Sequence, residues 1–543
     1  MQNQAETTTP VSTLDPGFLE ECEREALHHI GAIQPYGALL GGRLGDATVR
    51  AVSADLDAWL GRPTASLLGR ALWPLLAELG ARLGSARAEP DPATSRNPIA
   101  ELEHAIATPP PARQGHAEKL VLVDLVQGPR GPLDAIVSRT ADTWLMELET
   151  ALPSEQQQHA LRPVPHALYR MPHSPKEWEA HCSLLAAQMQ RVSGFDRVMV
   201  YRFLPDACGE VIAEAAQPGL APYLGLRYPA SDIPQVARAL YLANRHRQIP
   251  TVAANPVPVL AMPDFTPDLT LSDLRAVSPV HIDYLRNMEV TASLSFSVVL
   301  NGALWGLIAC HHHAPRHLPL QLRERCADLV QVFSLGIAGY QTAQRLGAVS
   351  DSDRDISRLA AGIAAFETGA DQDFHVGDAL LALTRADGAA FAQTAGGELL
   401  TFGRTPPTAA LHELLQWLVA EHPEPVYATD CLGAEHAAAA AYQREASGLL
   451  AVRVITYAGP APVDRVFMWF RPEQPQTVYW AGDPRKSTLF DGQSNMRSPR
   501  SSFAAWLETK TGHAEPWSDT VLLSAKKFRS LLLRQMNADL LRG

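Results

Sequence analysis

The hexapeptide Pro229-Ala230-Ser231-Asp232-Ile233-Pro234 is the stretch from which the fold and the function of this chain are inferred. Each proline fixes its own φ angle and restricts the residue before it, so the chain direction is set on both sides of Asp232. The Asp232 carboxylate and a nearby backbone carbonyl can therefore be held rigidly toward a bound group. We expect this segment to present a fixed acceptor to a cofactor.

Length and composition indicate a protein of several domains. The chain has 543 residues, 46% hydrophobic and 19% charged, enough for about three or four domains with ordinary cores. Its formal net charge of -12 at pH 7 disfavours nonspecific attraction to nucleic acid or to an anionic membrane surface. We find no secretory signal pattern, and no apolar run approaches the ~20 residues of a membrane helix, so we expect a cytoplasmic protein. Six cysteines without paired spacing favour reduced thiols over disulfides or a zinc cluster.

Apolar periodicity first indicates two α/β regions. Residues 37–149 alternate short apolar runs with turns and contain a helical stretch at 65–83, which predicts a small antiparallel sheet with helices. A second region begins with a helical pattern at 178–192 and contains Asn301-Gly302, a dipeptide suited to a tight hairpin. The strands expected in the second region are 197–203, 292–300 and 304–311.

A long helix leads into a third region. Residues 320–366 lack proline and place Phe333 on an apolar stripe with a spacing of four, so we expect a helix that joins two domains. A further helical pattern begins near Thr520 and places Leu532 on a similar stripe. These stripes would otherwise face water, so we expect a homodimer through the long helices. The strands expected in the third region include 449–455 and 465–470.

Two sets of motifs establish a family resemblance. The hexapeptide, together with Phe195-Asp196-Arg197-Val198-Met199-Val200-Tyr201 and Tyr228, resembles the chromophore-pocket signature of the phytochromes, most of all that of the bacterial, biliverdin-binding phytochromes. The motifs that resemble those of their PHY domain are Phe470-Arg471-Pro472-Glu473, Trp480-Ala481-Gly482-Asp483-Pro484 and Pro499-Arg500-Ser501-Ser502-Phe503. The last two would flank a projecting hairpin called the tongue. The resemblance covers nearly the whole chain from Cys22.

The resemblance implies an α+β fold of three consecutive α/β sensor domains, PAS, GAF and PHY, with antiparallel sheets joined by long helices. It also implies a PHY tongue hairpin and an N-terminal figure-of-eight knot, in which the N-terminal segment passes through a loop of the GAF domain with Ile33 at the crossing. The expected divisions are an N-terminal segment at 1–36, PAS at 37–150, GAF at 151–345, PHY at 346–520 with the tongue at about 478–517, and an output helix at 521–543.

The same resemblance implies a red/far-red photoreceptor that carries biliverdin IXα. Cys22 stands in the position of the cysteine that forms a thioether with the ring A vinyl group. The residues alone leave this open, because a lone cysteine is no proof of reactivity. Light would isomerise the bond leading to ring D without making or breaking a substrate bond, so we expect no enzyme activity in this chain.

A linear tetrapyrrole needs cations and hydroxyls for its propionates. Arg247 and Arg275 match family positions that hold the propionates, and a planar guanidinium can bind a carboxylate through two hydrogen bonds. Either arginine alone would more often be a solvated surface charge. Ser293 and Ser295 alternate on one face of a strand, so both hydroxyls can face the ligand. The expected set also includes Tyr241 and Ser278.

The pyrrole NH groups of a cationic bilin need oxygen partners. The resemblance places the backbone carbonyl of Asp232, His281 and a shared water around them, and either residue could handle the proton of the bilin. Alone, His281 would more often be a satisfied structural histidine. His311 is expected to donate a hydrogen bond to the ring D carbonyl. The other residues expected to line the pocket are Met199, Tyr201, Tyr223, Tyr228, Ile233 and Tyr284.

The run His311-His312-His313 suggests a metal site at first sight. On a strand, however, only His311 and His313 share a face, and no cysteine or carboxylate lies at ligand spacing. We therefore expect no metal at this run.

The tongue offers a route from the pocket to an output. In the family, the tongue arginine, here Arg500, pairs with the pocket aspartate, here Asp232, in one photostate. In the other state the tongue is helical and Ser502 replaces Arg500 as the contact to Asp232. A contact made in only one state biases a two-state equilibrium. The expected relay residues are Asp232, Trp480, Arg500 and Ser502.

Leu226 departs from the family pattern. Family members often carry a histidine or a glutamine at this position beside ring D, and a leucine cannot donate a hydrogen bond. The sequence therefore leaves open whether the dark-adapted state absorbs red or far-red light.

Two other functions are compatible with these domain types. A PAS/GAF regulatory protein could sense a cyclic nucleotide or haem, but it would not require Cys22, Arg500 and the hexapeptide together. The chain could also be the sensory part of a light-regulated histidine kinase, although it has no glycine-rich phosphate-binding segment. The expected partners are a bilin, a second copy of the chain, and a downstream output domain, kinase or response regulator, with neither nucleic acid nor membrane.

Overall fold

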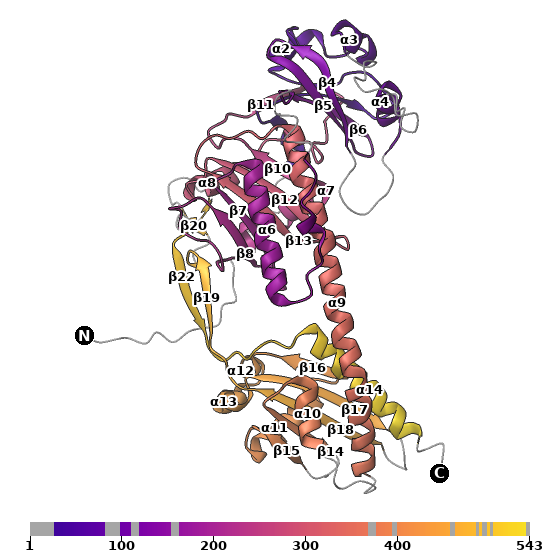
Figure 1. The fold of residues 1–543 in the computed structure, drawn as a ribbon, viewed down its shortest axis with the longest axis vertical. Coiled ribbons are helices and arrows are strands. Elements are labelled where there is room, and N and C mark those ends of the chain that lie inside the picture. Colours follow the sequence, from indigo (N-terminus) through magenta and orange to yellow (C-terminus); the bar gives the residue numbers. More distant parts are fainter. Residues whose placement is uncertain are drawn as a thin grey trace, which may run out of the picture. The chain divides into compact units, whose positions relative to one another are not determined.

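The structure is a computed structural model, traced in Figure 1. It describes residues 26–81, 98–109, 119–153, 162–367, 376–393, 399–456, 462–484, 488–490, 497–499 and 503–538. The predictions for Cys22, Arg500 and Ser502 lie outside these residues. The chain forms two compact units, Met1–Gly339 with Tyr479–Trp506, and Tyr340–Val478 with Leu507–Gly543. Among the described helices, none has the length and apolarity needed to cross a membrane.

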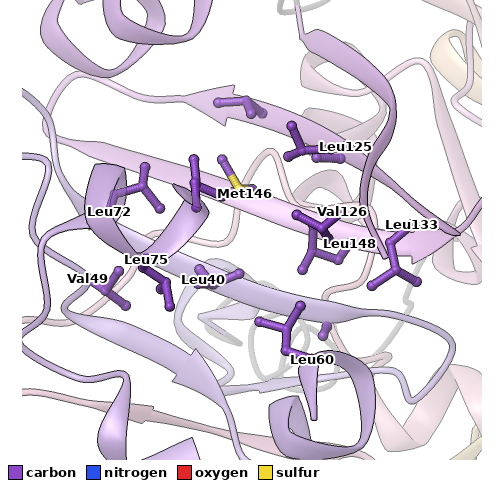
Figure 2. Close-up of a cluster of buried hydrophobic side chains, with 14 of the residues drawn as sticks. Leu40, Val49, Leu60, Leu72, Leu75, Leu125, Val126, Leu133, Met146 and Leu148 are labelled. Carbon is purple, nitrogen blue, oxygen red and sulfur yellow. The ribbon is translucent and has the colours of Figure 1, made fainter. Parts of the chain in front are cut away.

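The first sheet of the first unit has the strand order β1-β11-β3-β2-β6-β5-β4. Leucines of short helices pack against its apolar face, as Figure 2 shows for Leu72 and Leu75 beside Leu40 and Met146. The helix expected at 65–83 is shorter, because Gly69 adopts a left-handed conformation (φ +78°) between a 3₁₀ turn and α3. The elements are β2 (Ala38–Arg43), β3 (Ala51–Ser53), α2 (Leu56–Leu60), the 3₁₀ turn (Thr64–Ser66), α3 (Leu72–Glu78), α4 (Pro98–Ala107), β4 (Leu120–Gly128), β5 (Gly131–Arg139) and β6 (Thr143–Thr150).

The N-terminal segment passes between two stretches of the following domain. Strand β1 (Ala32–Ile33) pairs with β11 (Val257–Ala261), which in turn pairs with β3. On its other side Ile33 forms a bridge with Arg275, and the Gln34 N–H donates to the Leu274 carbonyl at 2.7 Å. Ile33 therefore lies between these two stretches with its side chain fully buried, whereas the passage of residues 1–25 through the loop lies outside the described residues and the knot stays a prediction.

The second sheet of the first unit has the order β10-β12-β13-β7-β8-β9-β19-β22. The predicted hairpin is present between β12 and β13, where both turn residues have positive φ, 51° at Asn301 and 78° at Gly302. Helix α6 packs on β7 and β8 (Figure 1). The elements are α6 (Pro175–Ser193), β7 (Arg197–Phe203), β8 (Gly209–Ala216), β9 (Arg227–Tyr228), α7 (Gln235–Ala243), β10 (His246–Ile249), α8 (Pro279–Asn287), β12 (Ala292–Leu300) and β13 (Ala303–His312).

Helix α9 (Leu320–Glu367) contributes residues to both units, in agreement with the long joining helix expected at 320–366. The expectation that Phe333 and Leu532 face water is wrong. The Phe333 ring stacks on Trp178 of α6 at 5.7 Å, and Leu532 is fully buried in the core of the second unit. Other parts of the same chain thus cover the apolar stripe of a helix. Leu335, two residues after Phe333 on α9, is exposed (65%).

The second unit is built on one antiparallel sheet with the order β15-β14-β18-β17-β16. Its C-terminal helix packs on β17, and the Phe528 ring meets Phe467 and Trp469 edge-on. The elements are α10 (Val376–Thr384), β14 (Gly388–Gln393), β15 (Leu400–Gly403), α11 (Thr408–Glu421), β16 (Val426–Thr429), α12 (Leu432–Glu435), α13 (Gln443–Ala446), β17 (Gly448–Thr456), β18 (Val463–Arg471) and α14 (Asp519–Ala538).

The segment expected to form the tongue contains strands in this structure. Trp480 of β19 (Gln476–Ala481) pairs in parallel with Arg227 of β9. Strands β20 (Thr488–Phe490) and β21 (Arg497–Pro499) pair antiparallel with each other, and β21 lies against α8. Strand β22 (Ala505–Lys510) completes the set. The described part of the tongue is therefore in an extended form.

Candidate functional site

The second domain of the first unit is the part built on the sheet that contains β7, β10, β12 and β13. One cavity of about 240 Å³ lies in this domain, between α7, α8 and one face of that sheet. Leu27 of the N-terminal segment also lines it. Tyr223 lies outside this lining, with the Arg197 guanidinium 3.8 Å from its ring centroid. The predicted residues that line the cavity are Met199, Tyr201, Tyr228, Asp232, Ile233, Tyr241, Arg247, Arg275, Ser278, His281, Tyr284, Ser293, Ser295 and His311.

Two arginines make one end of the cavity cationic. Arg247 donates to the backbone carbonyls of Asp273 at 3.2 Å and Ala276 at 2.9 Å, and also to that of Arg275, so much of its hydrogen-bonding capacity is used within the protein. Arg275 is buried, and its Nη1 has no hydrogen-bond partner among the described residues. Burial and then the nearby Arg247 lower the pKa of Arg275 to about 9. A buried cation with an unused donor is suited to a carboxylate of a ligand.

Hydroxyl groups stand next to these arginines. Strand β10 pairs with β12, so that Arg247 lies opposite Ser295 and Ile249 lies opposite Ser293. The hydroxyls of Tyr241 and Ser295 are 2.8 Å apart and share a hydrogen bond. The predicted alternation of the two serines on one face of a strand therefore brings both to the cavity.

Two of the histidines that line the cavity, His281 and His311, favour the neutral form. Burial lowers the pKa of His281 to about 4, with a smaller effect from Arg247, and burial lowers the pKa of His311 to about 3. His311 Nδ1 is buried and has no hydrogen-bond partner in the described part of the chain. The His281 ring stacks on Tyr284 with centroids 5.9 Å apart. A buried neutral imidazole with an unused nitrogen is suited to a polar atom of a ligand.

The hexapeptide forms a 3₁₀ turn at Ala230–Asp232 between two extended prolines. The Tyr284 hydroxyl donates a 2.8 Å hydrogen bond to Asp232 Oδ2. Sequence reasoning missed Arg238, which donates from Nε to the Ile233 carbonyl at 2.7 Å and from Nη2 to the Ala207 carbonyl at 2.7 Å. Its position four residues after Pro234, on the helix that the hexapeptide begins, was the available signal.

The tongue approaches the cavity through one aromatic contact. The ring of Phe503 meets the ring of Tyr284 edge-on, with centroids 5.0 Å apart. Ala481, from the other side of the tongue, is fully buried in the same apolar cluster. Tyr284 therefore contacts both the tongue and the pocket aspartate Asp232. Leu226 is buried in this cluster too, but it does not line the cavity.

The loop that carries Arg275 is held by the first domain, which sequence reasoning also missed. Glu147 of β6 accepts hydrogen bonds from the Ser272 hydroxyl, the Asp273 N–H (3.0 Å) and the Leu274 N–H (2.9 Å). Burial, and then the charge of Asp273, raise the pKa of Glu147 to about 7. An acidic residue in the otherwise apolar strand 144–148 was the signal for such a role.

Lys119 of the first domain and Tyr36 of the N-terminal segment hold the same loop. Lys119 Nζ lies 2.6 Å from Asp273 Oδ1, and the Tyr36 hydroxyl donates to the Asp273 carbonyl at 2.8 Å. Together with Glu147, these contacts fix the backbone on both sides of Asp273. The position of Arg275 in the cavity therefore depends on the first domain.

The interpretation of the histidine run needs a correction. Strand β13 ends at His312, so His313 no longer follows the alternation of the strand. His312 and His313 both approach Asp196, a carboxylate that is distant in sequence and was therefore not considered. The structure thus brings a carboxylate to the run at ligand distance.

Family models match three consecutive stretches of the chain: a PAS fold at residues 22–125, a GAF domain at 177–339 and a phytochrome region at 352–540. The chain is 33% identical to cyanobacterial phytochrome B of Nostoc sp., over 95% of this chain and 66% of that protein. It is 34% identical to a bacteriophytochrome of Xanthomonas campestris pv. campestris, over 95% of this chain and 79% of that protein. The chain thus spans just under two thirds of the Nostoc relative.

Solved structures give the same result for the fold. A bacteriophytochrome from the photosynthetic bacterium R. palustris matches with a TM-score of 0.75 and 32% identity, over 96% of this chain and 99% of that one. The photosensory core module of the Stigmatella aurantiaca phytochrome matches with a TM-score of 0.72 and 32% identity, over 95% of this chain and 97% of that one. Three sensor domains with antiparallel sheets, as predicted, are therefore confirmed.

Proposed function

Because the chain belongs to the phytochrome family and is a red/far-red light photoreceptor, we propose that its bilin is biliverdin IXα, attached by a thioether to Cys22. Phytochromes bind a bilin, and cyanobacterial and bacterial members both resemble this chain. The observation that carries the proposal is that Leu27 and Arg275 line one cavity. Cys22 precedes Leu27 by five residues, a reach of up to roughly 17 Å for an extended chain.

The residues of the cavity fit such a pigment. Arg275, with its unused donor, and Arg247 would hold the propionates, helped by the hydroxyls of Ser293 and Ser295. His281 and the Asp232 carbonyl would face the pyrrole nitrogens, and His311 would donate to the ring D carbonyl. When bound, the bilin supplies light absorption and an isomerisation about the bond leading to ring D. The residues that would wall the space around ring D are Met199, Tyr201, Tyr228 and Tyr284.

The tongue would relay the change in the pocket to the output. Strand β21 ends one residue before Arg500 and lies against α8, whose Tyr284 contacts Asp232. This extended form corresponds to the state in which Arg500 would pair with Asp232. In the helical form Ser502 would take its place, so the two pairings bias a two-state equilibrium in opposite directions.

The output of the whole protein is a separate proposal. Phytochrome photosensory modules are generally dimeric, and Leu335 and Leu346 are exposed on α9 (65% and 62%), where a second copy could cover them. We favour a cytoplasmic sensory module that controls a downstream output, of which a histidine kinase or a response regulator is the leading candidate. The photosensory core itself would carry out no chemistry on a substrate.

The attachment step is tested by assembling the chain with biliverdin and denaturing the product. We expect pigment to remain on the unfolded wild-type chain and to be lost from Cys22→Ala. Cys208→Ala, at a half-buried cysteine that lies outside the cavity lining, is the matched control and should keep its pigment. Covalent pigment on Cys22→Ala would overturn the attachment, whereas reversible photoconversion would still support the photoreceptor function.

A further inference from the structure

A carboxylate and two imidazoles converge at the edge of the second domain, away from the cavity lining. Asp196 precedes β7, His312 is the last residue of β13, and β7 and β13 pair in antiparallel register. His312 Nδ1 lies 2.8 Å from Asp196 Oδ2, and His313 Nδ1 contacts the same oxygen. All three ligand atoms lie within 4.8 Å of one another.

The hydrogen bonding inside this cluster leaves one ring nitrogen unused. The His313 backbone N–H donates to Asp196 Oδ2 at 3.0 Å. His312 Nδ1, although close to the same oxygen, makes no hydrogen bond with any described residue and is buried. A buried nitrogen without a partner next to a carboxylate is a costly arrangement in the absence of a bridging group.

The surroundings hold two ligands in place and leave the third accessible. The Phe195 ring lies 5.8 Å from the His312 ring, and side chains of Asp196 and His312 are mostly covered. The nearby cation Arg316 is engaged elsewhere, since its Nε donates to the Ser193 carbonyl at 2.8 Å. The His313 side chain is 75% exposed, so solvent can reach the cluster.

We propose that Asp196, His312 and His313 bind a divalent transition-metal cation, with Zn²⁺ as the ion that fits best. Two imidazoles and one carboxylate are a ligand set that Zn²⁺ accepts, with water in the fourth position. Hard cations such as Mg²⁺ prefer oxygen ligands, so they should not compete. This proposal does not depend on the chromophore.

Metal binding at this cluster should also affect the chromophore cavity. This second expectation rests on the proposed function. His311, the neighbour of His312 on β13, lines the cavity and has an unused ring nitrogen. A metal that fixes the end of β13 would restrict His311. We therefore expect Zn²⁺ to shift the absorbance of the pigment-loaded chain, and the shift to be absent in His313→Gln.

The test is Zn²⁺ binding to the chain without bilin and without a histidine tag, measured by competition with a coloured chelator. We expect one site per chain, with affinity reduced about tenfold or more in His313→Gln and in Asp196→Asn. His173→Gln, at an exposed histidine elsewhere, is the control and should bind as the wild type does. His313 is on the surface, so its variant should fold, which far-ultraviolet circular dichroism checks.

Equal affinity in the wild type and His313→Gln, or no one-to-one binding to the wild type, would overturn the metal site. Mg²⁺ competing as well as Zn²⁺ would also contradict it. Because this experiment uses no pigment, its failure is distinct from a failure of the photoreceptor proposal.

Discussion

The Tyr284 hydroxyl donates a hydrogen bond of 2.8 Å to Asp232 Oδ2, while the Tyr284 ring packs edge-on against Phe503 at 5.0 Å. One side chain thus contacts the pocket aspartate through its polar end and the tongue through its apolar body. This pair of contacts is one physical connection between the cavity and the tongue, and each contact can be altered separately.

Tyr284→Phe removes the hydroxyl and keeps the ring. A net hydrogen bond of about 1 kcal/mol corresponds to about a fivefold change in an equilibrium constant. We expect the balance between the two photostates to move about fivefold away from the extended tongue, as measured by amide I infrared spectra in darkness and after illumination. Tyr169→Phe, at an exposed tyrosine, should change nothing. An unchanged balance in Tyr284→Phe would remove this contact from the relay.

Phe503→Ala removes the aromatic contact and keeps the Tyr284 hydroxyl. Such ring pairs contribute about 1 kcal/mol beyond the area that they bury, so the extended tongue should open more often. We expect hydrogen exchange in residues 479–484 to become at least about fivefold faster. The matched control is Tyr479→Ala, because Tyr479 is an exposed aromatic residue of the tongue (52%). The same protection in both variants would mean that Phe503 does not anchor the tongue.

Arg275→Ala should weaken bilin binding before any covalent step. Arg275 is buried with an unused donor in the cavity, and hydrogen bonds to charged groups contribute about 2 kcal/mol, or roughly a 30-fold change in affinity. Titration of biliverdin into a Cys22→Ala background measures this by absorbance. Arg286→Ala, at an exposed arginine of α8, is the control. If both variants bind biliverdin alike, Arg275 does not hold a propionate.

Glu147→Gln should change how stability depends on pH. The folded-state pKa of Glu147 is raised from 4.5 to about 7, by burial and by Asp273, so between these values the folded state holds a proton that the unfolded state lacks. The contribution of Glu147 to the free energy of unfolding is therefore greatest below pH 4.5. It falls as the pH rises toward 7, by at most about 1.4 kcal/mol per pH unit. The pKa of Asp273 is lowered and the pKa of Tyr36 is raised well above its usual value, so neither of these neighbours titrates in this interval.

Urea unfolding of the wild type and Glu147→Gln between pH 4.5 and 8 gives the measurement. We expect the difference in unfolding free energy to change with pH over the interval from 4.5 to 7 and to level off above it. Glu103→Gln, at an exposed residue of α4, should follow the wild type at every pH. A constant difference between the wild type and Glu147→Gln would contradict the raised pKa.

Local patterns in the sequence predicted elements well where apolar periodicity and turn chemistry agree. Strands β7 and β12 and the hairpin at Asn301-Gly302 follow from alternation and from positive φ angles that these two residues tolerate. The start of α9 at Leu320 follows the proline before it. The cavity residues came from motif resemblance, and the structure gathers nearly all of them around one space.

Long-range relationships could not be predicted from one sequence. The periodicity of Phe333 reveals an apolar stripe but not that Trp178 covers it. The cluster of Asp196 and His312 depends on the pairing of two strands. The hydrogen bonds between Glu147 and the loop before Arg275 depend on the packing of two domains. In each case the partners are more than 100 residues apart, as the separation of 126 between Glu147 and Asp273 illustrates.

The most direct test of the photoreceptor account is the absorbance spectrum of the chain assembled with biliverdin, recorded in darkness and after alternating red and far-red light. We predict reversible conversion between a red-absorbing and a far-red-absorbing form, and the dark spectrum will show which form Leu226 favours at rest. Failure to bind biliverdin, or a bound pigment whose spectrum does not respond to either light, would contradict the account.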